Sequence, residues 1–200
     1  IIIMNNFTIK NGILSGAEFI SSPNFNARPI KNDQPEVSGI VIHNISLPPS
    51  EFGKTDKNGM HFVKAFFQNQ LNPDDHDYFK DIHTLQVSAH LFIECDGAVT
   101  QFVNFNDRAW HAGQSSYLGR ANCNDFTIGI ELEGDDFSPF TDIQYEVLAK
   151  IIAAIHVAYP ATCRHLMGHS DIAPVRKTDP GEFFEWSRLR QMIDEQLISS

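Results

Sequence analysis

The chain has 200 residues, of which 42% are apolar and 20% are charged, and its formal net charge is -10. This length suits one buried core, so we expect a single domain over residues 1–200. The negative charge repels nucleic acids and anionic membranes, and no apolar run approaches the length of a membrane span. We therefore expect neither nucleic acid nor a membrane as a partner.

The N-terminal part of the chain contains Pro23, Pro29 and Pro35 among many asparagines. This pattern predicts an extended arm over residues 1–35 that wraps the body of the protein and forms no regular element. The opening residues Ile1–Ile3 lack the basic flank, the long apolar core and the cleavage site of a signal peptide. We therefore expect the protein to be cytoplasmic.

Three cysteines, Cys95, Cys123 and Cys163, lie far apart and form no C-x-x-C pair. Reduced thiols in a cytosol are the simplest interpretation of their odd number and wide spacing. Because free cysteine packs well in cores, we expect each one to be a small buried apolar residue and not a nucleophile.

A β-branched run with almost no charge extends from Val37 to Ile45. It predicts a strand that is buried on both faces near the centre of a sheet. His43 lies at the end of this run, where a side chain can reach a cleft while the strand fixes the backbone. Pro48 and Pro49 then stop further pairing.

Residues 50–81 are irregular in composition, and only His61–Phe67 suggests a short helix. Two interpretations stay open. The segment is either a mobile lid over a cleft or a static excursion along the surface.

Two β-rich runs, 89–94 and 98–103, flank an Asp-Gly pair, which is a strong hairpin signal. Thr127–Gly134 then alternates between apolar and polar residues, which predicts a strand with Glu131 and Glu133 on one face. We expect Glu133 to be solvated on that face.

A capping box at Thr141–Gln144 predicts the start of a helix that stops before Pro160. His156 falls off the apolar line of this helix, so we expect it to face solvent. A second amphipathic helix is predicted from Phe184 to Ile198. The chain is thus a single α/β (α+β) mixture.

The loop from Gly168 to Gly181 places a histidine, a lysine and two aspartates among prolines and glycines. No core would favour these groups, so the loop is a candidate site. A metal ion needs ligands from separate parts of the chain, and His43 is the obvious distant partner of His169. Two imidazoles and one carboxylate leave a fourth zinc position open for water, as in catalytic sites.

Zinc bound by His43, His169 and Asp179 would polarise a carbonyl and lower the pKa of its water to about 7. Glu131, on the polar face of its strand, could take the proton of that water and pass it to a leaving nitrogen. Lys177 could stabilise the oxyanion. The sequence has no H-E-x-x-H signature. The spacings alone therefore fit a second interpretation as well, in which these polar residues are hydrogen-bonded and have only a structural role.

Five segments of the sequence carry a resemblance to a known family. They read HNISLPP at 43–49, RAWHAG at 108–113, CNDF at 123–126, GIELEG at 129–134 and GHSDIAPVRKTDPG at 168–181. In this order they resemble the AmpD family of zinc amidases, the cytosolic 1,6-anhydro-N-acetylmuramyl-L-alanine amidases. The resemblance extends from about Pro23 to Trp186. It implies the amidase and peptidoglycan-recognition fold, a mixed central β-sheet flanked by helices.

The resemblance also implies a reaction and its residues. The reaction is hydrolysis of the amide bond between the lactyl group of anhydromuramic acid and L-alanine in recycled cell-wall muropeptides. Asp179, and not Asp171, is implied as the third metal ligand, and Asn44 is expected to orient His43 from behind. The implied set is zinc on His43, His169 and Asp179, with Glu131 as general base and Lys177 as oxyanion partner.

The substrate contacts are less completely implied. Where some relatives carry arginines that hold the carboxylates of the substrate, this chain has Gln86 and Asn122, and Arg120 or Arg176 is expected to compensate. The indole of Trp110 could stack on a sugar face, or it could be a buried aromatic residue. The residues expected to contact substrate are Trp110, His111, Arg120, Asn122 and Gln86.

Other functions compete with this one. An amidase that acts on intact wall outside the cytoplasm is disfavoured by the missing signal peptide. A non-catalytic peptidoglycan-binding module is disfavoured by the complete ligand set, and a serine hydrolase by the lack of a G-x-S-x-G turn. We expect a monomer that uses Zn2+ and acts on a small muropeptide.

Overall fold

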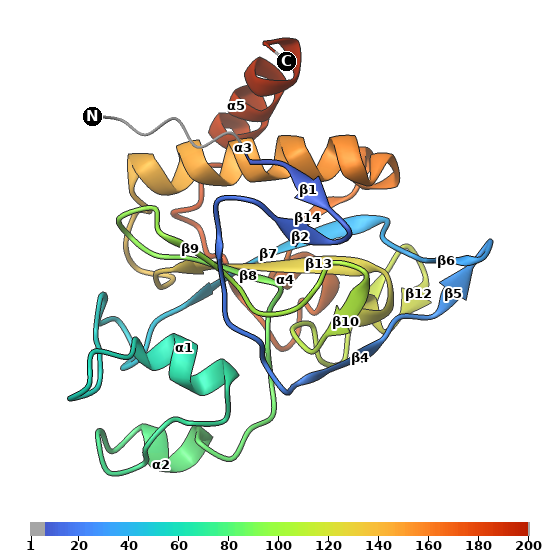
Figure 1. Ribbon diagram of the computed structural model, residues 1–200. Helices are drawn as coiled ribbons and strands as arrows, with labels where there is room; N and C mark the ends of the chain where they lie inside the picture. The colour runs from blue at the N-terminus through green and yellow to red at the C-terminus, as the bar shows by residue number, and fades with distance from the viewer. Residues whose placement is uncertain (1–6, 200) are drawn as a thin grey trace.

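The computed structural model of the chain describes residues 7–199 (Figure 1). A mixed six-stranded sheet crosses the middle of the molecule in the order β14-β7-β13-β8-β9-β3. Its strands are β3 (Glu18–Phe19), β7 (Gly39–Ile45), β8 (Leu91–Ile93), β9 (Val99–Gln101), β13 (Thr127–Glu133) and β14 (Leu166–Gly168). This confirms the expected fold class and the hairpin that joins β8 to β9, and the strand predicted from Val37 is present from Gly39 to Ile45. The expectations for Ile1–Ile3 concern residues outside the described part of the chain.

Helix α3 (Asp142–Ala158) lies across one face of the sheet, and α5 (Trp186–Ile198) lies beyond it (Figure 1). The capping box of Thr141 and Gln144 is present, as the sequence predicts. On the other side of the sheet lie α1 (Phe62–Phe67), α2 (Phe79–Ile82) and α4 (His169–Ile172). Two 3-10 turns, η1 (Cys123–Asp125) and η2 (Pro160–Arg164), complete the helical elements of residues 7–199. None of the helices in this range is long and apolar enough to cross a membrane.

The two faces of the sheet carry different side chains, because successive residues of each strand point to opposite faces. On β13, Ile128, Ile130 and Leu132 pack in the main core with residues of α3. Two smaller apolar clusters cover the opposite face, one around Phe92 and one around Val41. The polar residues of β13 point to this second face.

The register of the parallel strands fixes which polar groups meet. In the β13–β7 ladder, Glu131 lies opposite His43. In the β14–β7 ladder, Gly168 lies opposite Ile42, so His169 follows directly at the carboxyl end of β14. Since parallel strands of open sheets present ligand-binding residues at their carboxyl ends, this edge of the sheet is where a site is expected.

The N-terminal arm contains more regular structure than the sequence predicts. Besides β3, it forms the ribbon β1 (Ile9–Lys10) with β2 (Ile13–Leu14), strand β4 (Phe25–Ala27) and the ribbon β5 (Ile30–Lys31) with β6 (Gln34–Pro35). Strand β4 pairs with β10 (Asp107–Ala109), and β11 (Ser116–Tyr117) pairs with β12 (Arg120–Ala121). Within residues 7–35, β3 and β4 pair with strands of the body (Figure 1).

Arg28 anchors the end of this arm in the interior. Its buried guanidinium donates hydrogen bonds to four backbone carbonyls, those of Phe105, Asn124, Asp125 and Thr127. Burial lowers the pKa of Arg28 to about 9. The arm is therefore tied directly to the strand that carries Glu131.

The segment 50–81 contains the expected short helix as α1. Several of its aromatic residues are buried in the cluster around Phe92, among them Phe62, Phe67 and Phe79. These contacts fix the middle of the segment to the body. Movement of the rest over a cleft stays a prediction.

Two expectations about polar residues are wrong. His156 is buried and its Nδ1 lies 2.9 Å from the hydroxyl of Thr162, because η2 folds back over the end of α3. Glu133 is only 2% exposed, because the segment 50–61 covers the face of β13 on which it lies. Its carboxylate accepts hydrogen bonds from the N–H groups of Gly53 and Cys95 and pairs with His61 at 2.9 Å.

The cysteines agree with expectation only in part. Cys123 is buried, Cys95 is half-buried and Cys163 is exposed, and all three are free thiols. The prediction of burial is therefore wrong for Cys163, which lies in the surface turn η2.

Glu133→Gln is expected to destabilise the protein at pH 7. Burial alone would raise the pKa of Glu133, but the hydrogen bonds from His61 and two backbone N–H groups outweigh it and lower the pKa from 4.5 to about 2. This stability is present above pH 4.5 and is lost as the pH falls through about 2. We expect a loss of about 3 kcal/mol at pH 7, since one pKa unit corresponds to about 1.4 kcal/mol.

Urea unfolding of wild type and variant between pH 7 and pH 3 measures this difference, which should narrow as the pH falls. The matched control is Glu146→Gln on the exposed side of α3, for which we expect a change within about 0.5 kcal/mol. Equal stability of the Glu133 variant and wild type at pH 7 would contradict the assignment.

Candidate metal centre and active site

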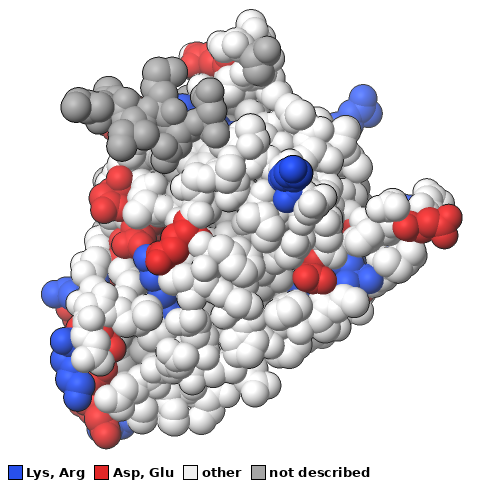
Figure 2. Space-filling view, in the orientation of Figure 1, with Lys and Arg blue, Asp and Glu red and all other residues white. Residues whose placement is uncertain are grey.

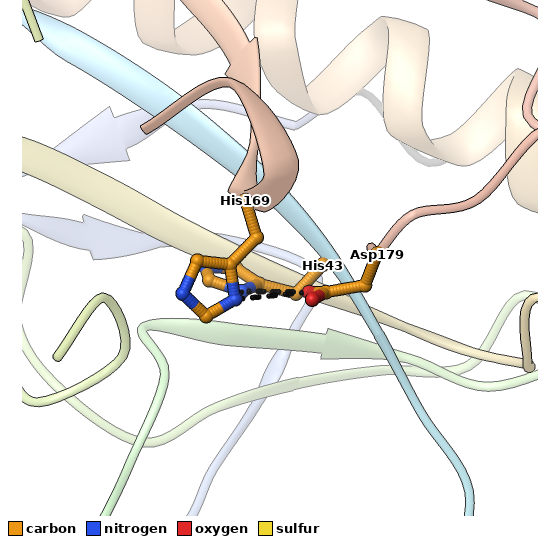
Figure 3. A group of neighbouring side chains, drawn as sticks. All are labelled: His43, His169 and Asp179. Carbon is orange, nitrogen blue, oxygen red and sulfur yellow. Dashed lines mark hydrogen bonds and ion pairs between the residues drawn. The ribbon is translucent and has the colours of Figure 1, made fainter. Parts of the chain in front are cut away.

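Three side chains converge at the carboxyl edge of the sheet (Figure 3). His43 comes from β7, His169 is the first residue of α4, and Asp179 lies in the loop that follows α4. The Nδ1 atoms of the two histidines lie 2.9 Å apart. Asp179 Oδ2 lies 3.2 Å from Nδ1 of His43 and 3.1 Å from Nδ1 of His169. Such a group of ligand atoms can hold a metal ion.

The donor set fits a divalent cation. His169 Nε2 lies 3.1 Å from the carbonyl oxygen of Ala112, which can only accept, so in the neutral imidazole Nδ1 carries the lone pair. The facing carboxylate oxygen of Asp179 also carries only lone pairs. Zinc holds tetrahedral ligands at about 2.0–2.1 Å, and so about 3.3 Å from one another, close to the spacing found here. His43, His169 and Asp179 are therefore a candidate metal site.

Burial sets the protonation of this site. Burial lowers the pKa of His43 to about 4, against the opposing effect of Asp179, so its imidazole is neutral at pH 7. Asp179 keeps its carboxylate ionised at pH 7, because its pKa stays well below its usual range although burial alone would raise it. A neutral imidazole and an ionised carboxylate are the forms that bind metals.

Glu131 lies beside the metal site on the same face of the sheet. It is 8% exposed, and its Oε2 is buried without a hydrogen-bond partner among the described residues. Burial, reinforced by the charge of Asp179, raises the pKa of Glu131 well above its ordinary value. An orphaned carboxylate oxygen of this kind is suited to take a proton from a group that enters the cleft.

The loop after β14 is held in shape by its own hydrogen bonds. Asp171 accepts a hydrogen bond from the N–H of Gly168, so it supports the loop, and it does not belong to the group of converging ligand atoms. Asn44 donates hydrogen bonds to Asp136 and to the carbonyl of Pro180. The expectation that Asn44 orients His43 is therefore wrong, since its amide holds the residue next to Asp179 instead.

A cleft of about 560 Å³ opens over these residues. The three metal ligands, Glu131, Lys177, Trp110, His111 and Arg176 all line it. One wall is apolar and comes largely from the 50–81 segment and the residues after it, which the sequence did not identify; it includes Phe66, Phe67, Ile82, Leu85 and Val87. Phe137, 79% exposed, stands at the rim.

Three residues predicted to contact substrate, Gln86, Arg120 and Asn122, do not line this cleft. The guanidinium of Arg120 makes two hydrogen bonds to the carboxylate of Glu36, at 2.8 and 2.9 Å, and is therefore already paired. Arg176 does line the cleft, but its Nη2 donates to the carbonyls of Ala112 and Gln114. A role for these residues in substrate binding stays a prediction.

The two aromatic residues of the RAWHAG motif have different positions. Trp110 is half-buried, and its indole N–H donates to Asn26 at 2.8 Å, which fixes the ring beside the cleft. His111 is buried behind His43, and the nearest ring nitrogens of the two residues lie 2.9 Å apart. Burial and the neighbouring His43 lower the pKa of His111 well below its ordinary value, so it is neutral at pH 7.

Charged side chains are scattered over the face of the molecule that Figure 2 shows. On the face that Figure 2 shows, acidic and basic side chains lie in small mixed groups, and large areas carry no charge.

Comparison with known proteins gives consistent results. The model of the N-acetylmuramoyl-L-alanine amidase family matches residues 32–182. The chain is 49% identical to the 1,6-anhydro-N-acetylmuramyl-L-alanine amidase AmpD of Haemophilus influenzae over 90% of this chain and 94% of that protein. It is 45% identical to the AmpD of Escherichia coli over 94% and 98% of the two chains.

Solved structures agree with this relationship. A crystal structure of a selenomethionine derivative of AmpD superposes with a TM-score of 0.86 and 46% identity, over 92% of this chain and 98% of that one. The amidase AmiD of Escherichia coli, in complex with anhydro-N-acetylmuramic acid-L-Ala-D-gamma-Glu-L-Lys, superposes with a TM-score of 0.58 and 25% identity, over 94% and 65% of the two chains. With its fold, its cleft and its ligand set, the chain belongs to the N-acetylmuramoyl-L-alanine amidase family.

Proposed function

We propose that this protein hydrolyses the amide bond between the lactyl group of 1,6-anhydro-N-acetylmuramic acid and L-alanine in muropeptides, as a step of cell-wall recycling. The observation that carries the proposal is the unpartnered Glu131 carboxylate beside three converged ligand atoms in one cleft. Relatives named for this reaction share nearly half of their residues with the chain.

We propose zinc as the resident metal, on His43, His169 and Asp179. Bound there, zinc supplies an electrophile that polarises a carbonyl and acidifies a water molecule. Glu131 accepts the proton of the attacking water and returns it to the leaving nitrogen of L-alanine, a role that its raised pKa suits. Lys177, half-buried at the cleft wall, donates to the oxygen on which negative charge develops.

The substrate class follows from the cleft. Its polar end holds the metal ligands and Lys177, and its apolar wall suits the face of a sugar or an alkyl chain of a stem peptide. The related AmiD binds an anhydromuramyl tripeptide, and a Pseudomonas aeruginosa relative, AmpDh3, was solved in complex with an anhydromuramic pentapeptide. We propose that Trp110 contacts the sugar of such a substrate.

Incubation with anhydromuramyl tripeptide, with and without a chelator, tests the function. Mass analysis should detect free anhydromuramic acid and tripeptide, and the chelator should stop their release until zinc is restored. An intact substrate after incubation with the zinc-loaded protein would refute the proposal.

We further propose that the protein acts as a monomer in the cytoplasm, in line with the recycling role that the resemblance implies. Light scattering of the purified protein and fractionation of the native host measure these two properties. A stable dimer or export from the cytoplasm would overturn the respective statement.

Lys177→Ala is expected to lower kcat by about 10²–10³-fold, the effect of losing one donor to an oxyanion. KM should change little, because the lysine acts on charge that develops after binding. Steady-state kinetics with anhydromuramyl tripeptide measure the two constants, and metal analysis should find the zinc content unchanged. Arg176→Ala, one residue away in the loop, is the matched comparison and should spare kcat more than Lys177→Ala does. An unchanged kcat for Lys177→Ala would remove the lysine from the mechanism.

A further inference from the structure

His111 lies between His43 and strand β13, and the mechanism above gives it no task. Both of its ring nitrogens have partners. Nδ1 lies 2.9 Å from His43 Nε2, and Nε2 lies 3.3 Å from the hydroxyl oxygen of Thr127. The two imidazoles meet edge to face, with ring centroids 5.0 Å apart. His111 is thus the middle member of a chain of polar contacts that ends at a metal ligand.

The hydroxyl of Thr127 determines which group donates in each hydrogen bond of this series. Its oxygen lies 2.7 Å from the carbonyl oxygen of Cys123, a shorter contact than the 3.3 Å to His111. A carbonyl can only accept, so the hydroxyl hydrogen points to Cys123 and the oxygen lone pairs face His111. Nε2 of the neutral His111 therefore carries the ring hydrogen, and Nδ1 carries the lone pair.

The same argument then determines which ring nitrogen of His43 carries the hydrogen. His111 Nδ1 can only accept, so Nε2 of His43 must be the donor across the 2.9 Å contact. The neutral His43 has one ring hydrogen, which leaves its Nδ1 with a lone pair. That atom is the one that faces the other two metal ligands.

We propose that His111, itself oriented by Thr127, is a positioning residue that holds His43 in the tautomer whose Nδ1 binds the metal. This inference rests on the proposed zinc site and deepens it. The neighbouring carbonyl of Ala112 does the same for His169. One dipeptide, 111–112, thus orients both histidine ligands from behind.

The surroundings leave His111 no freedom to turn. A Cβ on Gly129 would lie 2.3 Å from Cγ of His111, so the glycine in mid-strand makes room for the ring. The amide oxygen of Asn124 accepts hydrogen bonds from the backbone N–H groups of His111 and Ala112, at 3.0 and 2.8 Å. The ring and its backbone are both fixed before any metal binds.

Two matched pairs of variants test the proposal by zinc affinity. Thr127→Val removes the hydroxyl at nearly constant volume, and Thr127→Ser keeps it. His111→Leu removes the acceptor, and His111→Asn returns an oxygen near the position of Nδ1. Outer partners of metal ligands are worth about 10–100-fold in affinity, so we expect that loss of zinc affinity in the valine and leucine variants. The serine and asparagine variants should stay within a few-fold of wild type.

Competition with a chromophoric chelator measures these affinities, and thermal unfolding shows that each variant is folded. Long-range 1H–15N NMR of the zinc-free protein reports the tautomer directly. Wild type and Thr127→Ser should show His43 with its hydrogen on Nε2, and Thr127→Val should show a mixture of tautomers. A purely structural role for His111 would move the melting temperature without moving this spectrum.

The proposal is overturned if zinc-free wild type carries the hydrogen on Nδ1 of His43. It is equally overturned if Thr127→Val and His111→Leu keep wild-type zinc affinity and the wild-type tautomer. Failure of the wild type to bind zinc would instead refute the proposed metal. The tautomer of His43 is still measured in that case, because its spectrum is recorded on the zinc-free protein.

Discussion

Asp179→Ala is expected to abolish zinc binding and amidase activity together. The carboxylate is one of the three candidate ligand groups that converge among the described residues. Without it, two buried histidines remain, which is an incomplete set for a catalytic zinc site. We expect activity to fall by about a thousand-fold or more, since the metal supplies several kcal/mol of charge stabilisation. Metal analysis after dialysis and an assay with anhydromuramyl tripeptide measure both effects.

Asp171→Ala is the matched control, because Asp171 is the other aspartate of the same loop. Its carboxylate caps the N–H of Gly168 and makes no contact with His43 in the described structure. Loss of such a cap costs about 1 kcal/mol of stability. Zinc content should stay near one per chain. Zinc retained by Asp179→Ala but lost from Asp171→Ala would reverse the assignment of the third ligand.

Glu131→Gln is expected to lower kcat by about 10²–10⁴-fold, the usual contribution of a general base. Zinc content should not change, because the carboxylate is not one of the three converging ligands. The amide keeps the shape of the side chain but cannot take a proton, so the loss should fall on kcat and not on KM. Rapid-mixing or steady-state kinetics at pH 7 give the two constants.

The same substitution separates stability from activity. The pKa of Glu131 is raised in the folded protein, so the carboxyl favours folding below its ordinary value of 4.5 and loses this effect as the pH rises through the raised pKa. At pH 7 the zinc-free Glu131→Gln variant should therefore be at least as stable as wild type. Glu133→Gln, two residues along the same face, should show the opposite result, with lower stability and nearly unchanged kcat. Wild-type turnover by Glu131→Gln would exclude Glu131 as the base.

Much of the fold could be predicted from local pattern. The β-branched run of β7, the Asp-Gly hairpin and the capping box of α3 each carry their own signal, and the structure has each of them. Two of the errors share one cause. Glu133 and His156 stand at positions that a strand or a helix alone would expose, and distant segments of the chain cover them. Periodicity along one element contains no information about such coverage.

The candidate site also contains residues that could be predicted from the sequence and residues that could not. The grouping of His43, His169 and Asp179 near Glu131 could be predicted because five motifs resemble those of a known family, while their roles stay predictions. The groups that orient them could not, because Thr127 and Asn124 are common residue types and act through contacts between distant segments. One signal was available: Gly129 interrupts a β-rich strand, and glycine there indicates a close approach by another group. That group is the ring of His111.

The pairing of β13 with β7 has a consequence for folding. Successive strand residues point to opposite faces, so a slip of β13 by one residue would turn Glu131 into the apolar layer beneath α3 and would turn Leu132 toward His43. A molecule with that error could neither hide its charge nor assemble the residues that act on substrate. The amidase activity recovered during refolding therefore measures the fraction of chains in which β13 and β7 have paired in the correct register.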